Sequence, residues 1–275
     1  MNKYNIILDT DIGNSWDDQF ALVYLLKNQE LFDFDAITIE PFKHYEDENI
    51  IENEIISYNE IINIGALLNI DLSCITFKFS NDESVNKIID VAHKNEKTYI
   101  LAIGGLTNIY KAIKQEPDII NNVEVIWLGG NSIDYGNNKE FNFIQDIEAT
   151  TYLINSDINM TIIPTRNVVI DLMISINELT KILDMNTELS KYLCDRFLND
   201  KYYGVKEHRV IWDISAVAYM KNKDWFEVVN MSNLYVDNEY KYNESININS
   251  NVKMIKSLDN EKIYEDFFNS MTKVM

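Results

Sequence analysis

The chain of 275 residues has 46% hydrophobic and 25% charged side chains, a composition that excludes disorder of the whole chain and suffices for a buried core. Lys and Arg total 24 against 44 Asp and Glu, and the resulting formal charge of -20 opposes binding to a nucleic-acid backbone. No apolar stretch reaches the roughly 18 residues that a membrane span requires, and the first residues lack the longer apolar run of a signal peptide. We therefore expect a cytoplasmic protein whose partners include neither nucleic acid nor membrane.

Short apolar runs that are typical of buried strands alternate along the chain with amphipathic segments that are typical of helices. The strands are expected at Tyr4–Leu8, Ala36–Ile39, Cys74–Phe79, Thr98–Ile103, Val123–Leu128 and Met160–Ile163. The helices between them are expected at Asp17–Lys27, Glu52–Leu67, Ser84–His93, Thr107–Lys114 and Ile147–Ile154. This alternation predicts one α/β domain over residues 1–275, with a mostly parallel central sheet and helices on both of its faces.

The remaining part of the chain is less regular. A helix is expected over Trp212–Met220, and the C-terminal region, rich in Asn, Asp, Tyr and Lys, predicts further strands and a closing helix over Tyr264–Val274. Cys74 and Cys194 lie in separate apolar segments, so we expect both to be buried free thiols.

Glycines mark one edge of the predicted sheet. Of the eight glycines, six fall at or just beyond the ends of three expected strands: Gly13, Gly104, Gly105, Gly129, Gly130 and Gly136. Glycine lets a backbone approach a ligand closely, and in parallel α/β sheets ligands bind outside the carboxyl ends of the strands. The functional site is therefore expected at this edge.

The loop after the first strand carries four carboxylates within ten residues, on Asp9, Asp11, Asp17 and Asp18. In one interpretation they serve local structure, since Asp11 suits a turn and Asp17 and Asp18 suit the start of a helix. In the other they bind a divalent cation, which would remove the repulsion between carboxylates gathered at one strand end. Oxygen ligands without His or Cys favour Ca²⁺ or Mg²⁺.

Residues 9–22, which read DTDIGNSWDDQFAL, resemble the signature of a known family. It is the signature of the nucleoside hydrolases, the inosine/uridine-preferring ribohydrolases, in a variant with two extra residues before the paired aspartates. Four later segments are similar to family motifs and follow in the family's order: Leu101–Asn108, Trp127–Asn131, Glu140–Ala149 and Trp212–Ala216. The resemblance implies a Rossmann-like fold, hydrolysis of a riboside to free base and ribose in purine or pyrimidine salvage, and a homodimer or homotetramer.

The resemblance also implies the roles of individual residues. A Ca²⁺ ion would be held by Asp11, Asp18, Asp213 and the backbone carbonyl of Ile103, and Asp11 would also act as general base. The ribose would be bound by Asp17, Glu140 and Asn142, with Leu128 beside it, while Asp9 would support the loop from behind. Such a carboxylate-rich site suits the oxocarbenium-like transition state of N-glycosidic bond hydrolysis.

Trp212 departs from the family pattern, which has a His that contacts the leaving base at this position. An indole ring stacks on a base but does not protonate it as an imidazolium does. Trp212 is therefore either a base-stacking residue or a core residue, and Asp213 is either a metal ligand or a helix cap. His208 lies four residues earlier, where it would share a helical face with Trp212 as a replacement acid or else be solvated.

Other positions keep two interpretations. Glu40 stands where the family has a Gly-Asn pair, and it is either a ligand contact or a charged strand end. Tyr202 and Tyr203 either stack on a base or are exposed in a loop. Thr107 and Asn108 are expected to cap a helix. Asp134, Tyr135 and Asn137 lie in a loop to which no ligand contact is assigned.

Two other functions compete with riboside hydrolysis. If Trp212 has removed turnover, the chain would be a non-catalytic, Ca²⁺-dependent nucleoside or sugar-binding protein. The start Ile7–Asp11 also suits a haloacid-dehalogenase-like phosphatase with Mg²⁺, although Gly13 and the lack of a late acidic pair disfavour it. Release of ribose, rather than phosphate, would support the hydrolase.

Overall fold

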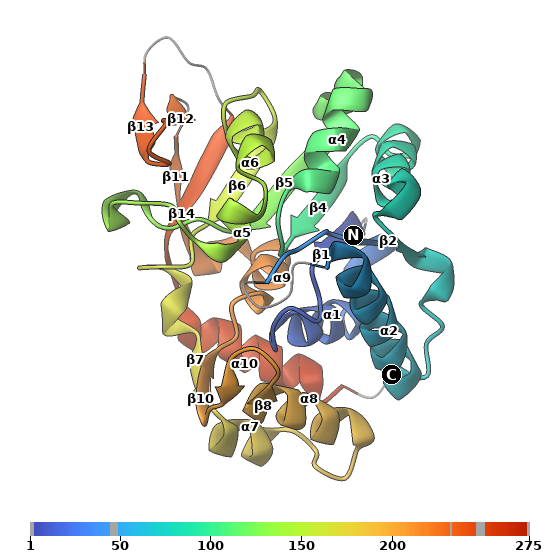
Figure 1. Ribbon diagram of the computed structural model, residues 1–275. Helices are drawn as coiled ribbons and strands as arrows, with labels where there is room; N and C mark the ends of the chain where they lie inside the picture. The colour runs from blue at the N-terminus through green and yellow to red at the C-terminus, as the bar shows by residue number, and fades with distance from the viewer. Residues whose placement is uncertain (1–2, 45–48, 232, 246–250, 274–275) are drawn as a thin grey trace.

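The computed structural model describes residues 3–44, 49–231, 233–245 and 251–273. An eight-stranded sheet in the order β11-β14-β6-β5-β4-β1-β2-β3 runs through the molecule (Figure 1). Its strands are β1 (Tyr4–Thr10), β2 (Phe32–Ile39), β3 (Thr76–Phe77), β4 (Thr98–Ala102), β5 (Val123–Leu128), β6 (Asn159–Ile163), β11 (Phe226–Asn230) and β14 (Val252–Leu258). Neighbouring strands are parallel, apart from β11 beside β14. The prediction of a mostly parallel sheet is confirmed.

Helices cover both faces of the sheet because strand side chains alternate between two cores. Ile6 and Leu8 of β1 belong to one core and Ile7 to the other. The first core includes residues of α1 (Asp18–Leu26), α2 (Ile50–Leu68), α8 (Glu188–Leu198), α9 (Ile214–Lys221) and α10 (Asn260–Met271). The second includes residues of α3 (Glu83–Lys94), α4 (Thr107–Gln115) and α6 (Ile147–Ile154).

The strand order reverses direction between β1 and β4. From β1 the chain proceeds outward to β2 and β3, and it then returns to β4, on the other side of β1. At such a switch point the loops after the two central strands diverge and leave a crevice for a ligand. The loop after β4 still passes close to the loop after β1, because a Cβ on Gly104 would lie only 3.1 Å from the carboxylate of Asp11. The predicted site therefore lies at this edge.

Short elements complete the chain. Two of its helices are α5 (Phe141–Gln145) and α7 (Ile176–Ile182). Three antiparallel pairs join β7 (Met173–Ser175) to β10 (His208–Val210), β8 (Asn199–Asp200) to β9 (Gly204–Val205), and β12 (Leu234–Val236) to β13 (Tyr242–Glu244). None of the described helices is both long and apolar enough to cross a membrane.

Three expectations about local structure need correction. The strand predicted over Cys74–Phe79 is only Thr76–Phe77, because β3 is an edge strand and is preceded by a 3-10 turn over Ser73–Ile75. Cys74 is therefore exposed rather than buried, whereas Cys194 is buried as predicted. The closing helix begins at Asn260, earlier than predicted, since Asp259 caps it; the predicted end, Val274, lies outside the described residues.

Candidate active site

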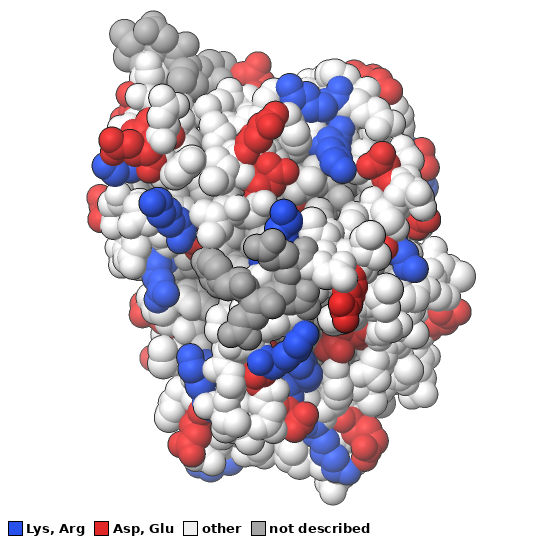
Figure 2. Space-filling view, viewed as in Figure 1, with Lys and Arg blue, Asp and Glu red and all other residues white. Residues whose placement is uncertain are grey.

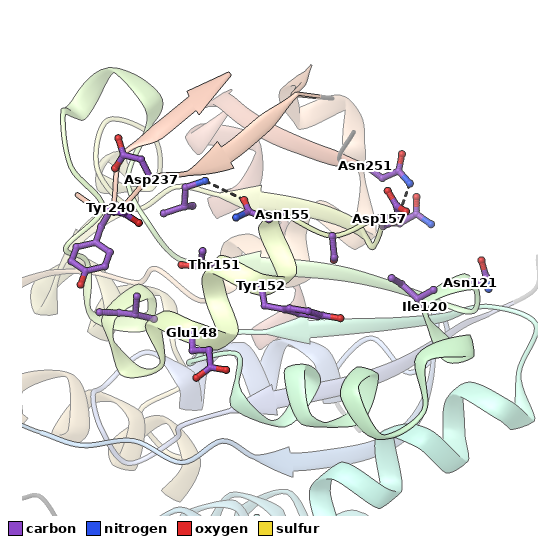
Figure 3. Close-up of a pocket in the computed structure, with 15 residues that line it drawn as sticks. Ile120, Asn121, Glu148, Thr151, Tyr152, Asn155, Asp157, Asp237, Tyr240 and Asn251 are labelled. Atoms are coloured by element: carbon purple, nitrogen blue, oxygen red, sulfur yellow. Dashed lines mark hydrogen bonds between the residues drawn. The ribbon is translucent and has the colours of Figure 1, made fainter. Parts of the chain in front are cut away.

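A cavity of about 570 Å³ lies at the carboxyl edge of the sheet, where the segments that follow β1, β4, β5 and β6 meet. Every residue that the sequence assigned to the site lines this one cavity: Asp11, Asp17, Asp18, Ile103, Leu128, Glu140, Asn142, Trp212 and Asp213. A second hollow of about 1190 Å³ adjoins α6 and the amino ends of β5 and β6 (Figure 3). It contains none of these residues and lies away from the edge where α/β sheets bind ligands.

Three buried carboxylates form the core of the site. Asp17, Asp18 and Asp213 each offer an oxygen within 4.8 Å of the others, and each side chain is at most 3% exposed. Asp11 lies outside that 4.8 Å group but lines the same cavity, and the negative charges of Asp18 and Asp17 act on it. The loop after β1 and the segment that carries Asp213, which are far apart in the sequence, are thus brought together.

Two helix starts carry this cluster. Asp17 and Asp213 occupy the N-cap positions of α1 and α9, which pack in the same core, yet neither side chain makes a capping hydrogen bond. Asp17 instead accepts hydrogen bonds from the Ser15 hydroxyl and, at 3.1 Å, from the backbone N–H of Trp212. The interpretation of Asp17 and Asp213 as helix caps is therefore wrong. Asp18 accepts a bond of 2.5 Å from the Thr10 hydroxyl.

Burial and mutual repulsion make the cluster costly when all its carboxylates are charged. Burial, and then the charge of Asp17, raises the pKa of Asp18 to about 8. Burial also raises the pKa of Asp17 to about 6 and holds those of Asp11 and Asp213 well above the ordinary range. A divalent cation would offset this repulsion, and a donor set of oxygens alone suits a hard ion. The residues present therefore fit a metal ion.

Asp9 lies behind the cavity rather than in its wall. Its Oδ1 accepts hydrogen bonds from the Thr38 hydroxyl at 2.6 Å and the Asn108 amide at 3.0 Å. Burial nevertheless raises its pKa to about 6. Asn108 also donates to the Ile39 carbonyl at 2.9 Å, so its side chain connects β1, β2 and α4 and does not cap a helix as predicted.

The cap of α4 comes instead from the end of β2. The fully buried Glu40 accepts hydrogen bonds from the backbone N–H groups of Thr107 at 2.6 Å and Asn108 at 3.0 Å. Burial and the charge of Asp9 hold the pKa of Glu40 well above its ordinary range. Glu40 is therefore neither an exposed strand end nor part of the cavity wall.

Replacement of Glu40 by alanine is expected to lower the free energy of unfolding by about 1–3 kcal/mol, since one buried and one partly buried N–H group lose their acceptor. Urea unfolding of Glu40→Ala and Glu40→Gln would measure this, with the glutamine variant, which keeps one acceptor oxygen, losing less. Equal losses in the two variants would contradict the capping role.

Glu140 and Asn142 form the side of the cavity next to β5. Glu140 caps α5 and accepts hydrogen bonds from the backbone N–H groups of Gly130 at 2.8 Å and of Asn142 and Phe143 at 3.1 Å. Burial raises the pKa of Glu140 to about 7. The Asn142 amide donates to the carbonyls of Ile103 at 3.1 Å and Leu128 at 2.9 Å. Because a carbonyl has two lone pairs, Ile103 keeps one for a metal ion.

Trp212 is half-buried and lines the cavity, so it is not solely a core residue. The Arg166 guanidinium lies 5.9 Å from the centre of its ring. His208 is exposed on β10 and shares the cavity wall, but the predicted helical face with Trp212 is wrong because residues 208–210 form a strand.

Of the loop aromatics, Tyr203 lines the cavity, as does Tyr135. Tyr202 instead stacks on His44, with ring centres 3.8 Å apart. Asn137 also lines the cavity, whereas Asp134 does not.

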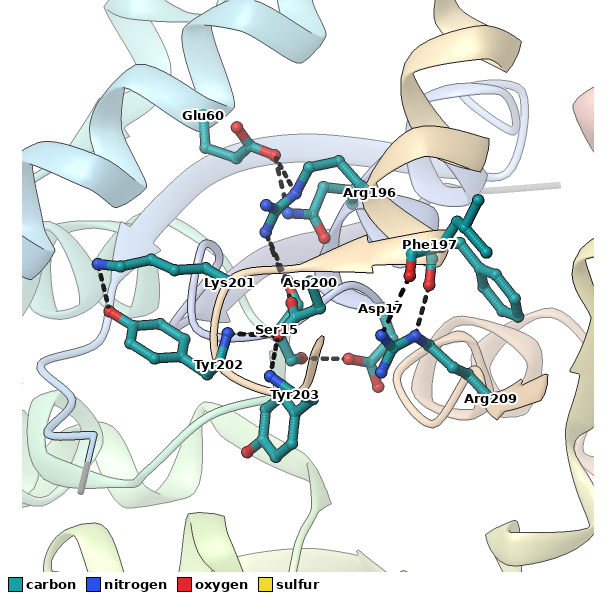
Figure 4. A network of polar contacts seen from close by, with 12 residues as sticks. Ser15, Asp17, Glu60, Arg196, Phe197, Asp200, Lys201, Tyr202, Tyr203 and Arg209 are labelled. Atoms are coloured by element: carbon teal, nitrogen blue, oxygen red, sulfur yellow. Dashed lines mark hydrogen bonds and ion pairs between the residues drawn. The ribbon is translucent and has the colours of Figure 1, made fainter. Parts of the chain in front are cut away.

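A polar network that the sequence did not reveal holds Tyr203 in place (Figure 4). The buried Asp200 accepts the backbone N–H groups of Tyr202 at 2.9 Å and Tyr203 at 2.7 Å, and lies 3.9 Å from Arg196. Arg196 donates to the carbonyl of Ser15 at 3.3 Å, next to the acidic cluster. The hairpin of β8 and β9 is thereby fixed to the loop after β1.

Arg209 makes a second connection between the same segments. Its guanidinium packs 4.2 Å from the ring centre of Trp16 and donates to the carbonyls of Phe197 and Gly204. These contacts join residues far apart in the chain, and no local pattern marks Arg196, Asp200 or Arg209 as members of the site.

Comparisons with known proteins agree in the kind of protein they find. The family model described as inosine-uridine preferring nucleoside hydrolase matches residues 59–265. The inosine-uridine preferring nucleoside hydrolase of Crithidia fasciculata is 36% identical over 94 residues, which are 32% of this chain and 30% of that protein. That of Leishmania major is 33% identical over 91 residues, 31% of this chain and 29% of that protein. The chain thus matches less than a third of the length of each relative.

Solved structures share the fold over the whole chain. An inosine-guanosine nucleoside hydrolase (IG-NH) superposes with a TM-score of 0.80 at 15% identity and covers 100% of both chains. A purine-preferring ribonucleoside hydrolase from Gardnerella vaginalis gives 0.73 at 18% identity over 97% of this chain and 98% of that one. At these identities the likeness establishes the architecture alone.

Proposed function

We infer, because the chain belongs to the inosine-uridine preferring nucleoside hydrolase family, that it hydrolyses the N-glycosidic bond of a ribonucleoside or related N-riboside to give free base and ribose. The observation that carries this proposal is the meeting of Asp11, Asp17, Asp18 and Asp213 in one cavity at the switch point of the sheet. Such a site surrounds a sugar with negative charge, as an oxocarbenium-like transition state requires.

In this proposal Asp11, Asp18, Asp213 and the carbonyl of Ile103 hold a calcium ion. Their hard oxygen donors support that choice: Asp18 and Asp213 belong, with Asp17, to the group of carboxylates whose oxygens lie within 4.8 Å of one another, and Asp11 lines the same cavity. A bound calcium ion supplies positive charge that makes a nearby water more acidic and offsets the repulsion between the carboxylates.

The chain's own side chains would then perform the reaction. Asp11 accepts the proton of the attacking water, and Asp17 and Glu140 accept hydrogen bonds from ribose hydroxyls. The amide of Asn142 donates to two backbone carbonyls, which leaves its oxygen for another hydroxyl. Fixing the sugar in this way converts an encounter between riboside and water into a prearranged attack.

Trp212 favours a second candidate function. It presents an aromatic face on which a base can stack, but its indole does not protonate the leaving base. Without turnover, the chain would be a calcium-dependent nucleoside or sugar-binding protein. The phosphatase alternative has no support, because the chain belongs to a different family.

An assay of reducing sugar released from inosine, guanosine, adenosine, uridine and cytidine, with calcium present, tests the proposal. We expect ribose release by the wild type and by the control Asp134→Ala, which changes an exposed carboxylate outside the cavity. The Asp11→Ala variant is expected to lose roughly 10²- to 10⁴-fold in rate, the usual contribution of a general base.

Full activity of Asp11→Ala would remove this residue from the mechanism. Binding of ribosides by the wild type without ribose release over long incubation would favour the non-catalytic alternative. Assembly into a dimer or tetramer, a cytoplasmic location and a role in salvage stay predictions.

A further inference from the structure

Basic side chains line the cavity together with the carboxylates. Lys139, Arg166, Lys206 and Arg209 belong to its wall, as does His208. The whole chain has 24 Lys and Arg against 44 Asp and Glu, whereas the described residues of the cavity wall include four Lys and Arg against five Asp and Glu. The described part of this wall is therefore less acidic than the chain as a whole.

Apart from Arg209, which is only 3% exposed, the basic side chains lie at a different depth from the aspartates. Asp11, Asp17, Asp18 and Asp213 are each at most 3% exposed, so they form the inner part of the cavity. Lys139, Arg166, Lys206 and His208 are exposed; we call these four residues the basic rim. The rim is contributed by three separate segments, which follow β5, β6 and β9. Figure 2 shows Lys and Arg side chains, interspersed with Asp and Glu, on one face of the molecule.

Three members of the rim have no acidic partner among the described residues. Lys139, Arg166 and Lys206 form no ion pair with any residue in the described ranges. Some exposed lysines elsewhere pair with a carboxylate, such as Lys191, which lies 2.7 Å from Glu188, whereas others, such as Lys253, have no ion pair within the described ranges. Cations that surround a ligand cavity and have no carboxylate partner within the described ranges point to a ligand that supplies the negative charge.

Arg166 is also placed beside the predicted base-stacking residue. Its guanidinium lies 5.9 Å from the ring centre of Trp212. A guanidinium binds carboxylate and phosphate groups with two parallel hydrogen bonds. If the base of a riboside stacks on Trp212, an anionic substituent of that riboside would therefore lie near the guanidinium of Arg166.

We propose that this cavity takes N-ribosides that carry an anionic group, with the ribose at the inner carboxylates and the phosphate or carboxylate at the basic rim. The proposal rests on the proposed function of the same cavity and names its substrate class. The negative group could be a 5′-phosphate or a carboxylate on the base, and both have the same chemistry for the rim.

Matched substrates distinguish a 5′-phosphate from a carboxylate on the base as the anionic group. The assay compares kcat/KM, in excess calcium, for uridine, uridine 5′-monophosphate and orotidine, which bears a carboxylate on the base, and for inosine and its 5′-monophosphate. At low ionic strength we expect at least one anionic substrate to exceed its neutral parent by about 10-fold or more, with the preference falling as salt is added. A preference for the monophosphates identifies a phosphate site, and a preference for orotidine identifies a carboxylate site.

Charge-removing variants connect the preference to the rim. In the double variant Arg166→Gln with Lys206→Gln, we expect kcat/KM for the preferred anionic substrate to fall at least about 10-fold more than for the neutral parent. The control Lys253→Gln removes the same charge from an exposed position on β14 outside the cavity and should keep the wild-type preference.

Two results would overturn the inference in different ways. Neutral ribosides hydrolysed as fast as both anionic kinds, or a preference unchanged in the double variant, would contradict the anion site while the proposed hydrolase function stands. Failure to hydrolyse any riboside would instead contradict the proposed function, and this inference with it.

Discussion

The Asp213→Asn variant is expected to lose roughly 10²- to 10³-fold in riboside hydrolysis, because it removes a charge from the buried carboxylates proposed to hold calcium and stabilise the sugar cation. Asp213 meets Asp17 and Asp18 within 4.8 Å although it comes from a distant segment of the chain. Asn is as good a helix N-cap as Asp, so a loss of activity would report the charge rather than the start of α9. Reducing-sugar release, measured for the variant and the wild type at the same calcium concentration, gives the required kcat/KM.

The same substitution at another helix start provides the matched control. Asp259 occupies the N-cap position of α10, and its side chain accepts the N–H of Lys262 at 3.1 Å. Because Asp259 does not line the cavity, Asp259→Asn is expected to keep wild-type activity. Equal activity of Asp213→Asn and Asp259→Asn would show that the charge of Asp213 has no part in the reaction.

The metal-free protein, kept in chelator, is expected to lose several kcal/mol of its free energy of unfolding between pH 5 and pH 9. Burial raises the folded-state pKa of Asp17 to about 6 and that of Asp18 to about 8, from an ordinary 3.8. The folded state therefore holds protons that the unfolded state has released, and this contribution to stability is complete below the ordinary pKa. It is lost as the pH rises through the folded-state values.

Calcium is expected to reverse this loss, and to do so more strongly at pH 8 than at pH 5, since the ion competes with protons for the same carboxylates. Thermal unfolding followed by circular dichroism, in chelator and in calcium at each pH, measures both effects. The Asp18→Asn variant should flatten the pH dependence in chelator. A chelated wild type that gains stability from pH 5 to pH 8 would contradict the electrostatic account of the cluster.

Much of the fold follows from local patterns. Strands buried on both faces are continuously apolar, and the helices between them are amphipathic, so the parallel sheet could be predicted. The expected strand at Cys74–Phe79 is mostly not formed, because an edge strand with one neighbour is decided by long-range pairing. The exposure of Cys74 follows from the same cause.

Trp212 and Asp213 follow no strand of the central sheet, so only the family resemblance predicts them; the site residues after β1, β4 and β5 could be predicted because a parallel sheet brings its strand ends to one edge. Their partners could not. The side chain of Glu40, just after β2, caps α4, and the side chain of Asp200 accepts the backbone N–H of Tyr203. Such contacts depend on tertiary packing, and so does the gathering of Lys139, Arg166 and Lys206 from three segments into one rim.

Calorimetric titration of the chelator-stripped protein with calcium chloride at pH 7 tests most directly whether these carboxylates form one cation site. We predict one calcium ion bound per chain of the wild type and of Asp259→Asn, and no measurable binding by Asp18→Asn or Asp213→Asn. Binding of calcium by Asp213→Asn with wild-type affinity would contradict the account.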